Sequence, residues 1–318
     1  VIEVPYQKII KYQQDPHNTP VNKQNAWYHI VSAYDRVAQK VGVAAPYRHY
    51  LLYGWSGLLS NRARQRAGYD LYHYIVTIRQ RVLDAYGVEP QIRIIAHSHG
   101  GNVALWAAQV AHEEQAPFSV NLLYMMGTPI QEETVSFIRL PFYTCIISCY
   151  SLGDGIQGND CFSTYSRCSF KRMSDFIDLE EISDASRMRA DMQYVVNLQY
   201  HQVTHANMWL MGRDKPIFDF MEPLPLVALA PAFFSHLEER SPYPYYQAHL
   251  HGARGYCVTQ LIGSNNVEKK IIYRSPNLYP IIAQAQKQIK DTWTPADDSR
   301  NLVFNYQNFS AMWHAFGL

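Results

Sequence analysis

Ser98 is the residue whose surroundings say most about chemistry. It stands between His97 and His99 in IRIIAHSHGGNVALWAA, residues 92–108. An apolar run typical of a buried strand precedes it, and two glycines and a helical apolar pattern follow it. A serine at a sharp strand-to-helix turn exposes its hydroxyl at the carboxyl edge of a sheet, where it can act as a nucleophile.

Small residues on both sides of Ser98 fit such a turn. Bulky side chains two positions before or after the serine would clash with the helix or with the next strand. The sequence has Ala96 and Gly100 at these positions, and Gly101 gives further room where the helix packs on its neighbours. The N–H groups at the start of the helix point toward charge that develops there.

The stretch from 47 to 210 resembles the α/β-hydrolase family, in particular its lipase- and esterase-like members, in which HSHGGN is a familiar form of the turn. Alanine at the first position of Gly-x-Ser-x-Gly is a mild departure, because it is the next smallest residue. The family carries nucleophile, acid and histidine in this order along the chain. The resemblance implies that Asp154, after a strand-like run, is the acid and that His205, after another, is the general base.

Other residues compete for these roles. Asp160 is the alternative acid, and His201 is the alternative base, although we expect His201 to belong to a strand. Asp154 precedes a glycine, and this pair is also frequent in turns without a catalytic role. His249 and His251 have a spacing that suits a metal ion, but the sequence offers no third ligand, so we expect no metal site.

Two main-chain donors for an oxyanion are implied by the same resemblance. One is the N–H of His99, directly after the nucleophile, and the other is the N–H of Trp55, in the loop after an expected strand at 50–53. Family members often have His-Gly before this donor, whereas this chain has Tyr53-Gly54. The donor is a main-chain group, so this change does not remove it.

The side chains of His97 and His99 flank Ser98, but we do not expect either to serve as its base. A side chain next to the serine on such a turn points away from it. We expect both imidazoles to hydrogen-bond neighbouring loops.

Alternating strand-like and helical segments predict an α/β fold with a mostly parallel sheet flanked by helices. We expect a hydrolase core over 1–215, a lid-like insertion at 155–192 within it, and a C-terminal extension over 216–318 that packs on the core or belongs to the same domain. Helices are expected at about 25–40, 69–86, 102–113 and 280–293. Strands are expected at 50–53, 91–96, 120–129, 142–151, 192–200 and 269–274.

Composition excludes several classes of function. The net charge is +1 and no run of Lys and Arg is apparent, so we expect no nucleic-acid partner. The longest apolar run, 224–234, contains two prolines and is shorter than the ~18–20 residues that span a bilayer. Five cysteines form neither a disulfide framework nor a metal motif, and pairing of Cys161 with Cys168 is left open.

The resemblance implies covalent acyl transfer without a cofactor, in which Ser98 attacks, His205 moves the proton and Asp154 orients the imidazole. Apolar and aromatic content favours a small-molecule or lipid ester as substrate, as in a carboxylesterase or lipase. A thioesterase, peptidase or acyltransferase would use the same three residues, and a non-catalytic binding or scaffold protein is the alternative outside enzymes. We expect a soluble protein; the sequence leaves open a transient contact with a membrane surface, and whether the protein is cytoplasmic or secreted after loss of a leader.

Overall fold

A computed structural model describes a large part of the chain. The described residues are 26–42, 48–51, 53–55, 57, 60–158, 169–183, 186–196, 205, 226–237, 244–250, 256–262, 267–269, 278, 280–281, 283–284 and 287–288.

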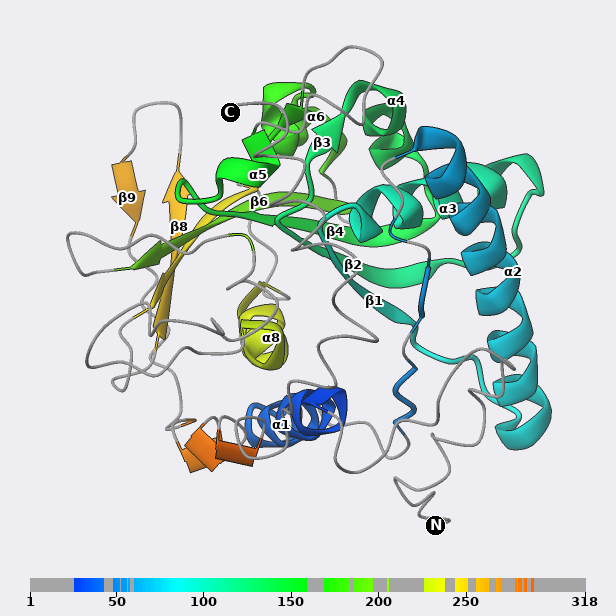
Figure 1. Cartoon of the computed structure of the whole chain (residues 1–318), viewed down its shortest axis with the longest axis horizontal. Helices are drawn as coiled ribbons and strands as arrows, with labels where there is room; N and C mark the ends of the chain where they lie inside the picture. The colour runs from blue at the N-terminus through cyan, green and yellow to red at the C-terminus, as the bar shows by residue number, and fades with distance from the viewer. Residues whose placement is uncertain are drawn as a thin grey trace, which may run out of the picture.

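A mostly parallel sheet of seven strands forms the centre of this part of the chain (Figure 1). Its strand order is β1-β2-β4-β6-β7-β8-β9. The first five strands in this order are parallel to their neighbours, whereas β8 and β9 are added antiparallel. The strands are β1 (Arg93–His97), β2 (Val120–Met126), β4 (Tyr143–Tyr150), β6 (Met188–Val196), β7 (Tyr245–Leu250), β8 (Tyr256–Ile262) and β9 (Val267–Lys269).

Helices cover both faces of the sheet, as Figure 1 shows. One face packs against α2 (Asn61–Tyr86) and α3 (Gly100–Glu113), and the other packs against α1 (Ala26–Lys40) and α8 (Leu226–Leu237). In β2, Tyr124 and Met126 face the α1 and α8 side, and Leu123 and Met125 face the α2 and α3 side. Burial on both faces explains why β2 is a nearly continuous apolar run.

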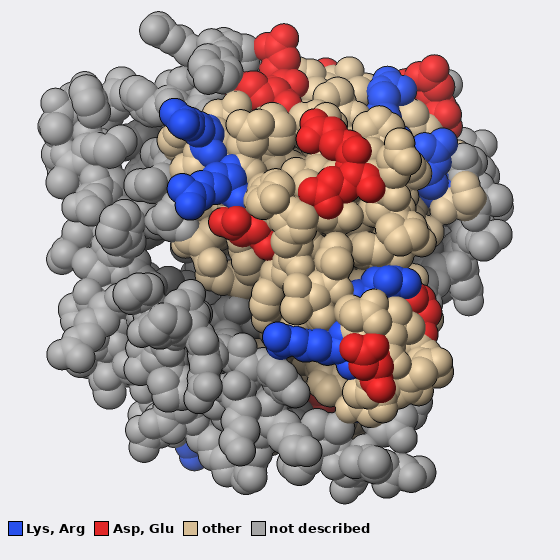
Figure 2. All heavy atoms as spheres, turned by 90° about the vertical axis from the view of Figure 1, so that its right-hand side faces the viewer, with Lys and Arg blue, Asp and Glu red and all other residues tan. Residues whose placement is uncertain are grey.

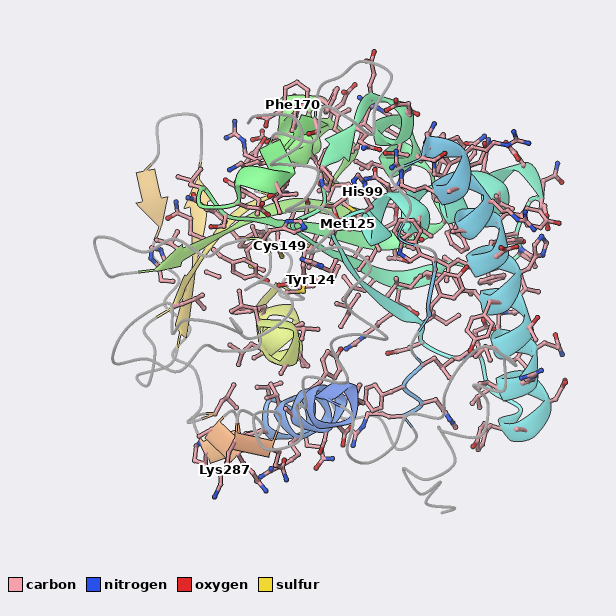
Figure 3. The ribbon with its side chains drawn as sticks, viewed as in Figure 1. His99, Tyr124, Met125, Cys149, Phe170 and Lys287 are labelled. Carbon is pink, nitrogen blue, oxygen red and sulfur yellow. The ribbon has the colours of Figure 1, made fainter. Side chains whose placement is uncertain are left out.

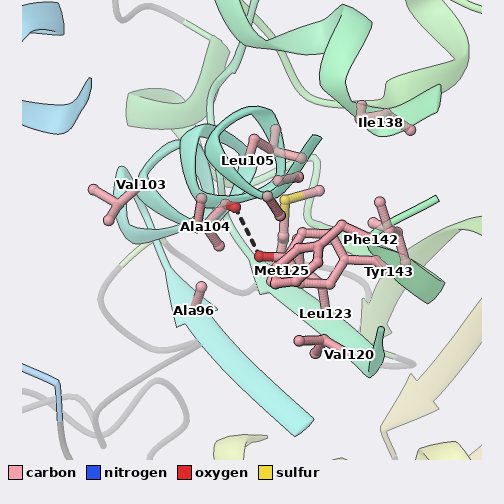
Figure 4. Close-up of a cluster of buried hydrophobic side chains, with 14 of the residues drawn as sticks. Ala96, Val103, Ala104, Leu105, Val120, Leu123, Met125, Ile138, Phe142 and Tyr143 are labelled. Atoms are coloured by element: carbon pink, nitrogen blue, oxygen red, sulfur yellow. Dashed lines mark hydrogen bonds between the residues drawn. The ribbon is translucent and has the colours of Figure 1, made fainter. Parts of the chain in front are cut away.

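On the α3 side of the core, a hydrogen bond within an apolar cluster joins β4 to α3. The Tyr143 hydroxyl donates a hydrogen bond of 2.7 Å to the Ala104 carbonyl oxygen, across the side chains drawn in Figure 4. Tyr124 and Cys149 lie on the opposite face, toward α8, as labelled in Figure 3. There the hydroxyls of Tyr124 and Tyr194 are hydrogen-bonded to each other at 2.6 Å, so these two buried phenols are satisfied.

Most predicted elements are present, and the prediction of a mostly parallel sheet with flanking helices is confirmed. The second helix begins earlier than expected, because Ser60 caps it by accepting a 3.4 Å hydrogen bond from the Ala63 N–H. It ends as expected at Gly87, whose φ of 67° is a left-handed cap. The helix expected from 102 begins at Gly100.

The strand expected at 50–53 is a wrong prediction for its described residues. Tyr50, Leu51 and Tyr53 are irregular, and Leu51 is 38% exposed. Their side chains contact helices instead: the Tyr50 hydroxyl donates to Asp35 at 2.6 Å, and the Tyr53 hydroxyl donates to the Ala67 carbonyl at 2.9 Å. Among the described strands, β1 is therefore an edge strand.

The later part of the chain contains elements that the sequence analysis did not predict. Strand β6 begins at Met188, inside the segment 155–192 that was expected to be a lid-like insertion. Strands β7 and β8 extend the sheet, and α8 forms although Pro231 lies within it. Burial explains α8, because its residues from Leu226 to Phe233 are all buried in the core.

The two elements expected near the C-terminus are described only in part. Of the strand expected at 269–274, residue 269 ends β9, and 270–274 lie outside the described residues. The described positions between 280 and 288 are helical. Of the strand expected at 192–200, residues 197–200 lie outside the described part.

Two surface properties concern the whole described part of the chain. None of its helices has the length and apolar character that crossing a bilayer requires. On the face seen in Figure 2, acidic and basic side chains are interspersed, and neither sign forms a large patch among the coloured residues.

Arg189 is a buried cation that joins three segments through carbonyl groups. Its Nε donates to Ile138 O at 2.7 Å and its Nη2 donates to Tyr143 O at 2.9 Å. Further bonds reach the carbonyls of Leu140, Thr144 and Met188. The guanidinium, 1% exposed, thereby fixes the start of β4 to the start of β6.

Replacing Arg189 with methionine should be strongly destabilising. The carbonyl groups lose a shared donor, and a buried unsatisfied group costs about 1–3 kcal/mol, so we expect the free energy of unfolding to fall by at least ~3 kcal/mol. Arg187→Met is the matched control, because the hydrogen bond of Arg187 to Arg139 O is exposed, and its loss should cost ~1 kcal/mol or less. Equal losses in urea unfolding would contradict this role of Arg189.

Candidate active site

The candidate site lies at the edge where β1, β2 and β4 end. His97 is in register with Met126, and Met126 is in register with Cys149. The main chain continues this pairing beyond the strands: the Ser98 N–H donates to Met126 O at 2.9 Å, and the Gly127 N–H donates to Cys149 O at 2.9 Å. The residues that follow the three strands therefore meet at one edge of the sheet.

Ser98 occupies a strained and partly exposed turn between β1 and α3. Its φ is 54°, a left-handed conformation that is costly for a residue with a Cβ, by about 1–2 kcal/mol. The Gly101 N–H donates to Ser98 O at 3.0 Å, which supports the turn. The strand–turn–helix arrangement predicted around Ser98 is present.

The tightest packing in this turn is at Gly101. A Cβ there would lie 2.2 Å from Thr128 Oγ1 and 2.6 Å from Thr128 Cγ2. A Cβ at Gly100 would lie 3.8 Å from the Ala96 Cβ, which is an ordinary contact. The sequence therefore identified the room needed at Gly101 correctly, whereas an alanine would fit at Gly100 two positions after the serine.

Alanine substitutions at the two glycines should have opposite effects. Gly101→Ala would push against Thr128, and we expect it to lower the stability by about 1–3 kcal/mol. Gly100→Ala has space, and the better helix propensity of alanine should make it neutral or stabilising by up to about 1 kcal/mol. Thermal unfolding of both variants checks this, and Thr128→Ala should recover part of the loss in Gly101→Ala. Equal destabilisation by both substitutions would contradict the packing argument.

Asp154 is fully buried in the turn that follows β4, and its two carboxylate oxygens have separate partners. Oδ1 accepts main-chain N–H groups from Ile156 at 3.0 Å and from Gln157 at 2.9 Å, in the short helix α5 (Gly155–Gly158). Oδ2 lies 2.8 Å from His205 Nδ1. The two N–H bonds hold the carboxylate so that its second oxygen faces the imidazole.

His205 meets Asp154 although the two residues are 51 positions apart in the sequence. A carboxylate only accepts hydrogen bonds, so this contact assigns the proton to Nδ1 and leaves Nε2 able to accept a proton. The sequence named this pair, and the structure brings the two side chains together. The alternatives Asp160 and His201 lie outside the described residues.

His97 contacts the main chain of His205. Its Nε2 lies 2.9 Å from His205 O, and the centroids of the two rings are 4.6 Å apart. Burial, together with the neighbouring His205, lowers the pKa of His97 to about 3. A neutral His97 has one N–H, and a carbonyl oxygen only accepts, so Nε2 carries the proton. The expected hydrogen bond of His97 to a neighbouring segment is made to His205 itself.

Asn102 fixes the loop after β2 to the first turn of α3. Its Nδ2 donates to Pro129 O at 3.0 Å, and its Oδ1 accepts from Thr134 Oγ1 at 2.6 Å. His99, at the N-terminus of α3, is buried, and its Nδ1 lies 3.5 Å from Asn102 Nδ2. The main chain around the expected His99 donor is thereby held in place.

Gln157 is a structural residue of the site that sequence reasoning missed. Its Nε2 donates to Thr128 O at 2.9 Å and to Lys171 O at 3.0 Å, so it ties α5 to the loop after β2. A small second sheet adds to this, in which β3 (Ile130–Gln131) pairs with β5 (Ser169–Phe170). Part of the segment predicted as a lid is thus attached beside the site, and its action as a lid stays a prediction.

For the remaining residues that the sequence analysis singled out, the structure gives burial only or does not describe them. Trp55 is half-buried and packs against the core cluster on the α2 and α3 side, so its role as an oxyanion donor stays a prediction. His249 is half-buried on β7, and His251 is outside the described residues, as are Cys161 and Cys168. Nowhere in the described ranges do three His, Cys, Asp or Glu side chains gather as metal ligands would.

Comparisons of the chain with protein-family models, curated proteins and solved structures found no match. The chemistry of the site is therefore inferred from its own geometry.

Protonation of His97 should make the protein less stable in acid. The unfolded chain binds this proton near the usual pKa of 6.5, but the folded protein binds it only near 3. The unfolded state then holds more protons in this window, so stability falls as the pH decreases from about 6.5 toward 3. Urea unfolding at about pH 4.5 and about pH 7 should show a smaller acid loss for His97→Gln than for the wild type.

The comparison of these two proteins removes contributions that they share. Burial raises the pKa of Asp191 to about 6, so this group favours the folded state as the pH falls, with the opposite sign. Asp191 is present in both proteins and cancels in their difference. The same acid loss in both would contradict the assignment to His97.

Proposed function

We propose that this protein is a serine hydrolase of the α/β-hydrolase type that cleaves carboxylic esters with apolar acyl groups. The observation that carries the proposal is the 2.8 Å contact between His205 Nδ1 and Asp154 Oδ2. It lies at the sheet edge where Ser98 stands in a strained turn at the end of β1. A serine, an imidazole and a buried carboxylate in this chain order are the parts of a nucleophilic triad.

The proposed reaction has two acyl-transfer steps. Ser98 Oγ attacks the ester carbonyl carbon while His205 Nε2 takes the hydroxyl proton. His205 then returns this proton to the departing alcohol, which leaves an acyl-serine. Water, deprotonated by the same Nε2, releases the acid and regenerates Ser98. Asp154 stabilises the imidazolium that forms in each step.

Main-chain donors stabilise the negative oxygen of the tetrahedral intermediate in this proposal. His99 directly precedes α3, and at this end the helix dipole favours negative charge near its N–H. Trp55 supplies the second N–H. One such donor contributes roughly 3 kcal/mol to transition-state stabilisation. The hydrogen bonds of Asn102 support this function by fixing the first turn of α3.

Apolar esters are favoured as substrates by one feature near the site. Leu152 is 59% exposed two positions before Asp154, where an apolar side chain gains stability only if it contacts another apolar group. An acyl chain bound along this edge would supply that contact. Lipid esters and other hydrophobic esters therefore fit the proposal better than strongly charged substrates.

Labelling with a fluorophosphonate and hydrolysis of p-nitrophenyl esters of increasing chain length test the proposal. We expect an adduct on Ser98 and turnover that rises with chain length. Ser98→Ala should abolish labelling and lower kcat by at least about 10³-fold, and His205→Asn and Asp154→Asn should lower kcat by about 10³–10⁴-fold. The control is Ser136→Ala, which removes an exposed serine on another part of the chain.

Other outcomes would identify other functions. Folded wild-type protein that forms no Ser98 adduct would contradict the proposal and favour a binding or scaffold role. An adduct that passes its acyl group to an added alcohol faster than to water would indicate an acyltransferase. Faster turnover of thioesters than of the matched oxygen esters would indicate a thioesterase.

A further inference from the structure

His97 connects the proposed nucleophile to the proposed base through one short stretch of chain. It directly precedes Ser98 at the end of β1, and its Nε2 lies 2.9 Å from the main-chain oxygen of His205. The two imidazole rings are 4.6 Å apart with 43° between their planes. These two histidines are 108 positions apart in the sequence, so the bond closes a long loop at the site.

The contact with Asp154 does not by itself fix the position of the His205 ring. One hydrogen bond to Nδ1 allows the ring to pivot about that bond, and a pivot displaces Nε2, the atom that must meet the serine hydroxyl. A second bond to the main-chain oxygen of the same residue fixes the point from which the side chain starts. Together, the two bonds hold His205 at its ring and at its main chain.

The electrostatic properties of His97 suit a side chain that holds the main chain of His205. Burial and the nearby His205 lower the pKa of His97 to about 3, so the ring is neutral at neutral pH. Other groups that face it are His99, which also disfavours its charged form, and the His205 carbonyl, which favours it. A neutral donor holds the main chain of His205 without placing a positive charge beside an imidazole that must itself become positive during proton transfer.

We propose that His97 is a positioning residue: its Nε2–H holds the main chain of His205 against the end of β1, so that His205 Nε2 is presented to Ser98. This inference rests on the function proposed above. It assigns a role to the side chain of His97, directly before the nucleophile. This role needs no contact between His97 and the substrate. Ser98 and His205 are then both attached to the end of β1, so a movement of this strand end displaces both residues together.

Two substitutions in the full chain separate the hydrogen bond from the volume of the ring. His97→Phe keeps an aromatic ring but has no donor, whereas His97→Gln has an amide N–H that can reach the same carbonyl. His112→Phe makes the same chemical change at an exposed position of α3 and serves as the control. Thermal unfolding of each variant shows whether it is folded before other properties are compared.

The first measurement does not require catalysis. Proton NMR detects the Nδ1–H of His205 as a low-field resonance while it is held by Asp154, and its loss from His205→Asn assigns it. We expect the resonance to remain in His97→Gln and His112→Phe and to broaden or vanish in His97→Phe. An unchanged resonance in folded His97→Phe would overturn the inference.

The second measurement is the hydrolysis of a short p-nitrophenyl ester. We expect His97→Phe to lower kcat about tenfold to a hundredfold with little change in KM, because misplacing a reacting group acts on the chemical step. His97→Gln should recover most of this loss. A fall in kcat that is equal in both variants and follows the loss of thermal stability would indicate a structural role only, and would also overturn the inference.

The two proposals fail in different ways. Wild-type protein that keeps the His205 resonance but forms no fluorophosphonate adduct would contradict the proposed hydrolase, while the NMR comparison would still decide the role of His97. Labelled and active wild-type protein with full activity in His97→Phe would contradict the positioning role alone.

Discussion

The register that makes β1, β2 and β4 end side by side is the constraint on which the rest of the site depends. Parallel pairing sets His97, Met126 and Cys149 side by side, and main-chain bonds carry this alignment into the following turns. A slip by one residue would exchange the two faces of a strand and move the next polar residue away from its partners. Burial of β2 on both faces makes such a slip costly.

Side chains that bond to carbonyl groups hold the loops that follow these strands. Asn102 binds the loop after β2 to α3, and Gln157 binds the same loop to α5. At the opposite part of the sheet, Arg189 uses five carbonyl groups to fix the starts of β4 and β6. Hydrogen bonds of this kind restrict the movement of irregular backbone around the site, which the proposed catalysis would require.

The strained turn at Ser98 fits the same arrangement. A left-handed serine costs free energy, and it persists because the surrounding contacts over-determine it. The Ser98 N–H is bound to β2, the Ser98 carbonyl accepts from Gly101, and the missing Cβ of Gly101 admits the Thr128 side chain. The close approach of α3 to the loop after β2 thus supports the left-handed conformation of Ser98, a residue that is partly exposed.

The sequence by itself determined the features that depend on neighbours along the chain. The apolar run, the serine and the glycines predicted a strand, a turn and a helix, and Gly87 predicted the end of α2. Asp154 and His205 were expected only from the order of residues that the resemblance to α/β-hydrolases implies. Tertiary contacts overrode local signals elsewhere: tyrosine anchors to helices replaced the strand expected at 50–53, and burial formed α8 around Pro231.

Only the tertiary structure decided which polar groups meet. The partner of His97 is 108 positions away, and the partner of Asp154 is 51 positions away. Neither contact can be predicted from the composition or periodicity of the chain. Hydrophobic patterns specify the buried faces of helices and strands, but they do not specify which polar side chains meet. The roles of Gln157 and Arg189 were missed for the same reason: each acts through carbonyl oxygens, which every residue carries and which sequence patterns do not distinguish.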